Sequence, residues 1–141
     1  MRVKGAEALL MSAGIRTDVS PGQKLTIVQG DVVRVNLSFQ YRGPAQSVTP
    51  YASIGKITFG IFDEIASARG SNKSLSQSDS FISYTAYVDI PSSNCKPEAN
   101  YDLMAKLEQY PGDTEVRLTD VIDVIGAMEF RSFQITGYDV V

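Results

Sequence analysis

The chain has 141 residues, of which 43% are hydrophobic and 21% charged, a mixture typical of a folded domain. We therefore predict one domain over residues 1–141. The net charge of −3 lacks the basic excess that binding to a phosphate backbone requires, so we expect no nucleic-acid partner. Histidine is absent and Cys95 is the only cysteine, which excludes an imidazole base and a cysteine-rich zinc cluster.

The first fourteen residues, MRVKGAEALLMSAG, have the basic start of a secretion leader. Their apolar run, Ala8–Met11, is too short for a leader and Glu7 interrupts it, so we interpret this segment as mature protein. No stretch of the sequence approaches the ~18 apolar residues of a membrane-spanning helix. We expect no membrane span.

Two strands are predicted next along the chain. The segment DVVRVNLSFQY, residues 31–41, alternates apolar and polar residues and is rich in β-branched and aromatic types, which predicts a half-buried strand. Just upstream, Leu25 and Ile27 lie on one face of a short predicted strand between a Pro-Gly turn and a Gly-Asp turn.

Residues 47–65 are apolar, but their alternation changes phase at Gly55. A β-bulge or tight bend at this glycine would explain the change, so we predict one long, bent strand. The serine-rich residues 67–80 contain almost no apolar anchor. We predict a mobile surface loop there.

Residues 81–91, FISYTAYVDIP, alternate again and end at a proline. Both faces of this predicted strand carry aromatic side chains, and Phe81 and Tyr87 lie on the face opposite to the one we assign to the core.

Residues 100–113, NYDLMAKLEQYPGD, alternate as well and close in a Pro-Gly turn. We expect Tyr101 and Leu103 to face the core, and Asp102 and Met104 to lie on a mostly solvated face.

The outward side chains Phe81, Tyr87 and Met104 are the predicted interaction residues, because an exposed apolar patch is typical of a surface that binds a partner. An alternative stays open. Strands from the C-terminal part of the chain could cover these side chains and make them part of the core.

Residues 115–141 predict two or three further short strands, separated by Gly126 and Gly137. Turn signals recur every ~8–12 residues without helical crossovers, a spacing typical of all-β sandwiches. We predict an all-β fold, an antiparallel β-sandwich with extra C-terminal strands.

One corner of the chain resembles a known family. A strand ending in DIP, a short polar connection and then Tyr101 followed by alternating apolar residues resemble the corner between strands E and F of immunoglobulin-like domains. The segments PGQKLTI and DVVRVNLSFQY look like strands A′ and B of the immunoglobulin-like modules in bacterial, archaeal and phage surface proteins. The resemblance covers about residues 15–126.

This resemblance implies an immunoglobulin-like fold, in which the Tyr101 hydroxyl bonds back to the backbone of the connection and fixes the corner. It also implies a role in adhesion, in assembly or as a spacer. Leu103 stands where an antibody-type domain has its second disulfide cysteine, so antibody-like function is not implied.

Carboxylates are the only candidate catalytic groups, and no nucleophile has an activating base nearby in the sequence. No spaced calcium-ligand motif and no glycine-rich phosphate loop occurs. We interpret the acidic residues as solvated surface groups and predict no enzyme activity, catalytic residue, metal site or cofactor. The candidate carboxylates are Asp63, Glu64, Asp89, Asp120 and Asp123.

The leading hypothesis is a non-catalytic structural or protein-interaction module, a virion or cell-surface component that binds a protein partner or itself. The alternative is a carbohydrate-binding module in which Tyr41, Tyr51 or Tyr87 stacks on sugar rings.

Overall fold

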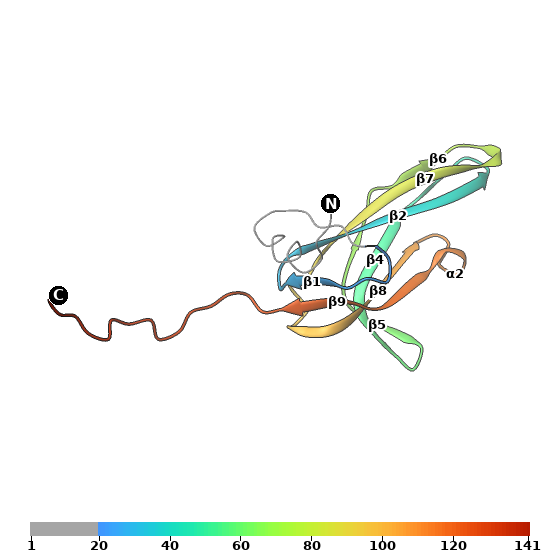
Figure 1. Cartoon of the computed structure of the whole chain (residues 1–141). Helices are drawn as coiled ribbons and strands as arrows, with labels where there is room; N and C mark the ends of the chain where they lie inside the picture. The colour runs from blue at the N-terminus through green and yellow to red at the C-terminus, as the bar shows by residue number, and fades with distance from the viewer. Residues whose placement is uncertain (1–19) are drawn as a thin grey trace.

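The computed structural model describes residues 20–141 as a mostly-β fold with one short helix (Figure 1). The predicted mature N-terminal segment, residues 1–14, lies outside the described residues. In chain order the elements are β1 (Leu25–Val28), β2 (Val32–Gly43), β3 (Gln46–Val48), β4 (Pro50–Thr58), β5 (Ile61–Arg69), β6 (Lys73–Leu75), β7 (Ser78–Pro91), β8 (Glu98–Leu107), α2 (Pro111–Thr114) and β9 (Val116–Ile125).

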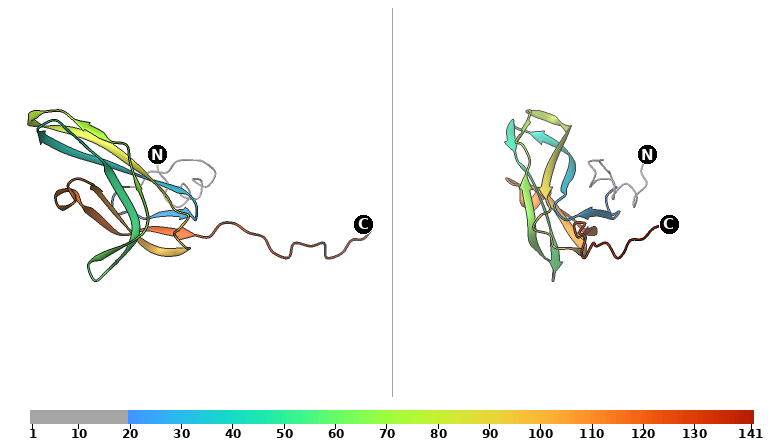
Figure 2. Two further views of the ribbon diagram at one scale, coloured as in Figure 1. Left: turned by 180° about the vertical axis from the view of Figure 1, so that it is seen from behind. Right: turned by 90° about the vertical axis from the view of Figure 1, so that its left-hand side faces the viewer.

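The strands form one five-stranded sheet in the order β1-β9-β8-β4-β5 and two two-stranded sheets, β2-β7 and β3-β6. The long β2–β7 ribbon lies across the larger sheet and projects beyond it with β6 beside it (Figures 1 and 2). The prediction of a purely antiparallel arrangement is wrong at one edge, because β1 pairs with β9 in parallel. These two strands lie at opposite ends of the described chain, so no hairpin imposes an antiparallel direction on them.

The predicted single strand over residues 47–65 is wrong, because the chain turns back within it. Strands β4 and β5 form a hairpin whose two loop residues, Phe59 and Gly60, have φ angles of 51° and 78°. Positive φ at both positions is typical of the tight turns that join antiparallel strands. The alternation of Ile57, Phe59 and Ile61 continues across this turn, so the hydrophobic pattern did not reveal the reversal.

The bulge predicted at Gly55 is confirmed, since the β4–β5 register shifts between Ile54 and Gly55. The bulge brings the two backbones close together. A Cβ atom at Gly55 would lie 2.1 Å from the backbone oxygen of Asp63, so only glycine fits there.

The loop predicted over residues 67–80 is also wrong. Residues 67–80 instead contain the end of β5, strand β6 and the start of β7. Leu75 is its apolar anchor, and it packs with Val48 and Leu107 in a small second core. A single leucine among serines gives little periodic signal, so the sequence pattern missed this strand.

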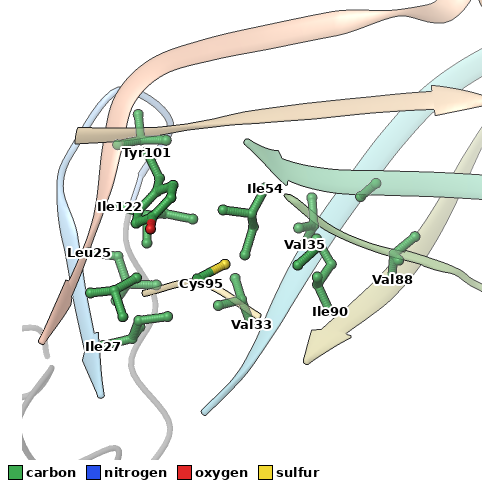
Figure 3. Packing of buried hydrophobic residues seen from close by; sticks show 14 of the residues in the cluster. Leu25, Ile27, Val33, Val35, Ile54, Val88, Ile90, Cys95, Tyr101 and Ile122 are labelled. Atoms are coloured by element: carbon green, nitrogen blue, oxygen red, sulfur yellow. The ribbon is translucent and has the colours of Figure 1, made fainter. Parts of the chain in front are cut away.

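The main core lies between the five-stranded sheet and the β2–β7 ribbon (Figure 3). Val33 and Val35 of β2 and Ile90 of β7 meet Ile54 of β4 in this core. Cys95 is a free thiol buried among these side chains, and its burial raises the pKa of the thiol above its ordinary value.

Tyr101 is fully buried, and its hydroxyl donates a hydrogen bond of 2.7 Å to the backbone oxygen of Lys96. This is the bond expected of the corner tyrosine. Asp102 and Met104, predicted on a solvated face, are instead buried. Strand β8 lies between β4 and β9 in the sheet, so both of its edges are paired, and buried residues occur on both of its faces. Period-two alternation does not separate core from solvent in a strand that is buried on both faces.

The predicted extra C-terminal strands are reduced to one. Strand β9 ends at Ile125, and residues 126–141 form no strand or helix. Figures 1 and 2 show this segment leading away from the body of the protein. We call residues 126–141 the tail.

Candidate functional site

Two of the three predicted interaction residues lie at the surface. Phe81 is 59% and Tyr87 51% exposed, and both belong to β7. Met104 is only 6% exposed, so it does not join them in a surface patch. The tail does not cover the two aromatic rings, and the alternative in which C-terminal strands bury them does not occur.

A guanidinium group lies over each of these rings. Arg42 is 4.7 Å from the ring centre of Phe81, and Arg34 is 3.9 Å from that of Tyr87. Arg34 also donates two hydrogen bonds to Asp89, of 2.7 and 2.9 Å. Because each ring already has a cation on one face, this surface is amphipathic rather than an apolar patch.

The tail carries most of the highly exposed large apolar side chains in the described part of the chain. Each of its large hydrophobic residues is at least 82% exposed. Scattered surface hydrophobes are normal, but so many within one short segment are typical of a surface that binds a partner. They are Met128, Phe130, Phe133, Ile135, Tyr138, Val140 and Val141.

The tail has the pattern of a bulged strand. Met128 and Phe130 are two residues apart, as are Phe133 and Ile135, but the two pairs differ in phase. Ser132 lies between them with a φ of 57°. A strand with a bulge at such a residue would carry all four apolar side chains on one face.

An apolar groove of about 540 Å³ lies beside the outer half of β2. Leu37 and Phe39 of β2 form one wall, while Leu107 of β8 and Val116 of β9 line the other. A second hollow of about 250 Å³ continues along the first half of β2, where Val35 lines it. Together they follow β2 along most of its length.

The groove borders a free sheet edge. Among residues 20–141, β2 pairs with β7 alone, so the backbone groups on its other edge have no strand partner. We call this edge the β2 edge. Open edges of this kind can accept a further strand.

Two of the candidate carboxylates, Glu64 and Asp123, have a lowered pKa. Burial opposes ionisation of Glu64, but hydrogen bonds from Tyr51 and Ser53 outweigh it and lower the pKa of Glu64. Burial likewise opposes ionisation of Asp123, whose pKa is nevertheless lowered by the Asn100 amide and by Lys24. A general acid at neutral pH needs the opposite shift.

The candidate sugar-stacking tyrosines lie on three different strands, β2, β4 and β7. Tyr41 is half-buried beside the groove, and its hydroxyl donates to the backbone oxygen of Pro44 at 2.7 Å. Tyr51 has Lys106 over its ring at 5.2 Å. With Arg34 on Tyr87, two of the three rings have a cation on one face.

Comparison of the chain with protein-family models, with curated proteins and with solved structures found no match. Within residues 20–141, no helix has the length and apolar character needed to cross a membrane. The same residues contain no group of three or more acidic or cysteine side chains arranged to hold a metal ion.

Sequence reasoning missed both the groove and the exposure of the tail. The alternation around Phe130 and Phe133 predicts strands of the same domain, but the structure has no strand there. The groove is formed by residues distant in sequence, such as Leu37 and Val116, and no local pattern could reveal it.

Proposed function

We propose that this chain is a non-catalytic structural module that assembles with protein, of the kind used in virions or on cell surfaces. The observation that carries the proposal is the tail, whose exposed apolar side chains are typical of a surface that binds a partner. The outward aromatics Phe81 and Tyr87 with their arginines offer a second, more polar contact surface.

We further propose that the fold is an immunoglobulin-like β-sandwich. Strands β9, β8, β4 and β5 lie in an order that corresponds to G, F, C and C′ of variable-type domains, and β2 and β7 pair as strands B and E do. The buried Tyr101 and its bond to Lys96 support the same assignment. Such a scaffold hosts many functions, so the fold itself does not carry the functional proposal.

The test compares the full chain with a full-length Phe130→Ser/Phe133→Ser variant. Size-exclusion chromatography with multi-angle light scattering would measure mass over a range of concentrations. We expect the parent protein to form oligomers and the variant to stay monomeric. Phe59→Ser is the matched control, since it removes an equally exposed phenylalanine, 99% exposed, from the β4–β5 turn.

Two results would count against the proposal. One is a double variant that assembles as strongly as the parent, because the tail would then not be the contact. The other is a Phe59→Ser control that loses assembly as fully as the double variant. The carbohydrate-binding alternative has no comparable supporting observation, since cations cover one ring face of Tyr51 and Tyr87.

A further inference from the structure

We propose that the tail of one copy adds as a strand to the β2 edge of a second copy and fills the apolar groove beside it. This inference rests on the proposed assembly function and names its partner, a second copy of this chain, and its geometry. Each copy would supply one tail and one groove.

The β2 edge is unusually open to such an addition. Its strand is 12 residues long and contains no proline or lysine, which are common protections of sheet edges. The opposite edge of the ribbon differs, because the chain at Gly70 passes against it. A Cβ atom at Gly70 would lie 2.3 Å from the backbone oxygen of Tyr87 on β7.

The tail matches this edge in length and pattern. Residues 128–135 would span about 26 Å as a strand, and residues 33–41 of β2 span about 30 Å. With a bulge at Ser132, the tail would carry four apolar side chains on a single face. That number suits the groove and the second hollow, which together follow most of β2.

The groove offers an apolar floor for that face. A strand added to β2 would place alternate side chains between Leu37 and Phe39 on its own side and Leu107 and Val116 on the other. Its backbone would hydrogen-bond with the unpaired groups of the β2 edge. The added strand would therefore pair the free backbone groups of the β2 edge and cover the apolar side chains of the groove.

The geometry favours a second copy over the chain's own tail. Val116, at the start of β9, lines the groove, whereas the tail leaves from Ile125 at the end of β9. These points are about 30 Å apart along the 10-residue strand, and the tail leads away from the body (Figures 1 and 2). A contact between unlike surfaces joins copies head to tail, into a ring if the rotation between copies closes and into an open chain if it does not.

The test uses two full-length variants with complementary defects. The donor variant is Phe130→Ser/Phe133→Ser, in which the groove is intact. The acceptor variant is Tyr110→Glu/Val116→Glu, in which the tail is intact; both side chains line the groove, with 41% and 59% exposure, so neither substitution empties the core.

Light scattering of each variant alone should show association at least ~100-fold weaker than that of the parent, because two large apolar contacts are lost or blocked. A 1:1 mixture of the two variants should form a heterodimer that grows no further, since only one intact tail and one intact groove remain. The matched control for the acceptor is Phe59→Glu/Ile61→Glu, which places the same two charges at exposed positions outside the groove and should assemble like the parent. Circular dichroism melts would check that every variant folds.

The remaining outcomes overturn the inference in distinguishable ways. If the acceptor variant assembles like the parent while the donor variant does not, the tail binds elsewhere; the proposed function stands and this inference fails. A mixture that yields no heterodimer also overturns this inference and leaves the proposed function standing. If the parent is monomeric at all concentrations, the tail does not bind a second copy. A donor variant that assembles like the parent removes the proposed function and this inference together.

Discussion

Asp102 on β8 is a buried carboxylate that accepts hydrogen bonds from the two neighbouring strands, β4 and β9. Its replacement by asparagine tests how much these bonds stabilise the fold. The side chain is 5% exposed. One carboxylate oxygen accepts the backbone N–H of Ile57 on β4 at 2.6 Å, and the other accepts that of Asp120 on β9 at 2.8 Å. Asp120 has a φ of 54°, so this bond also holds a backbone conformation that non-glycine residues seldom adopt.

The expected cost follows from these two bonds. A hydrogen bond to a charged group contributes about 1.5–3 kcal/mol, and a buried donor left unsatisfied costs about 1–3 kcal/mol. Asparagine keeps the size of the side chain but turns one acceptor oxygen into an NH₂ group that faces a backbone N–H. We therefore expect Asp102→Asn to lower the free energy of unfolding by about 2–4 kcal/mol. Asp102→Ala, which removes both acceptors, should cost more.

Urea denaturation followed by circular dichroism measures this change through the midpoint and slope of the transition. The control is Asp63→Asn, an exposed carboxylate on β5, which should change stability by less than ~0.5 kcal/mol. The argument that Asp102 holds β4 and β9 through buried hydrogen bonds is refuted by either of two results. One is a free energy of unfolding for Asp102→Asn within ~0.5 kcal/mol of the parent, and the other is an equally large loss for the Asp63→Asn control.

Three further predictions follow from the core and the backbone. Tyr101→Phe removes the bond to Lys96 and should cost about 0.5–1.5 kcal/mol in urea melts; an unchanged midpoint would contradict the corner role. Gly55→Ala should cost at least ~2 kcal/mol because its Cβ has no room, whereas Gly112→Ala, with open space around it, should stay within ~0.5 kcal/mol; equal effects would argue against the bulge. Burial raises the pKa of the Cys95 thiol, so the protonated thiol favours the folded state. This contribution to the free energy of unfolding is fully present below the thiol's unfolded pKa of about 8.5 and is lost as pH rises through the higher pKa of the folded state. Melts from neutral to alkaline pH should show a smaller decline for Cys95→Ala, and parallel curves would contradict this.

Several features could be predicted from local sequence alone. The alternation in residues 31–41 and 81–91 identified β2 and β7, because a strand with one buried face has a period of two. The bulge at Gly55 was visible as a change of phase. The bond expected of Tyr101 is present, since that expectation depended on a short connection between consecutive strands.

Other expectations failed where a residue's environment depends on distant segments. Met104 was expected at the surface, but β8 lies inside the sheet and Met104 is buried. Leu75 appeared to be an isolated leucine in a loop, yet it anchors a small core with Val48 and Leu107. Neither result could follow from neighbouring residues.

The sequence by itself determined which stretches become strands and where glycine is required, because these depend on side-chain alternation and local backbone sterics. Only the tertiary structure decided that β1 and β9 pair in parallel and that, within residues 20–141, the β2 edge has no strand partner and the tail is exposed. Strand order and exposure depend on contacts between residues far apart in the chain, and no local pattern encodes which distant segment will cover a given apolar face.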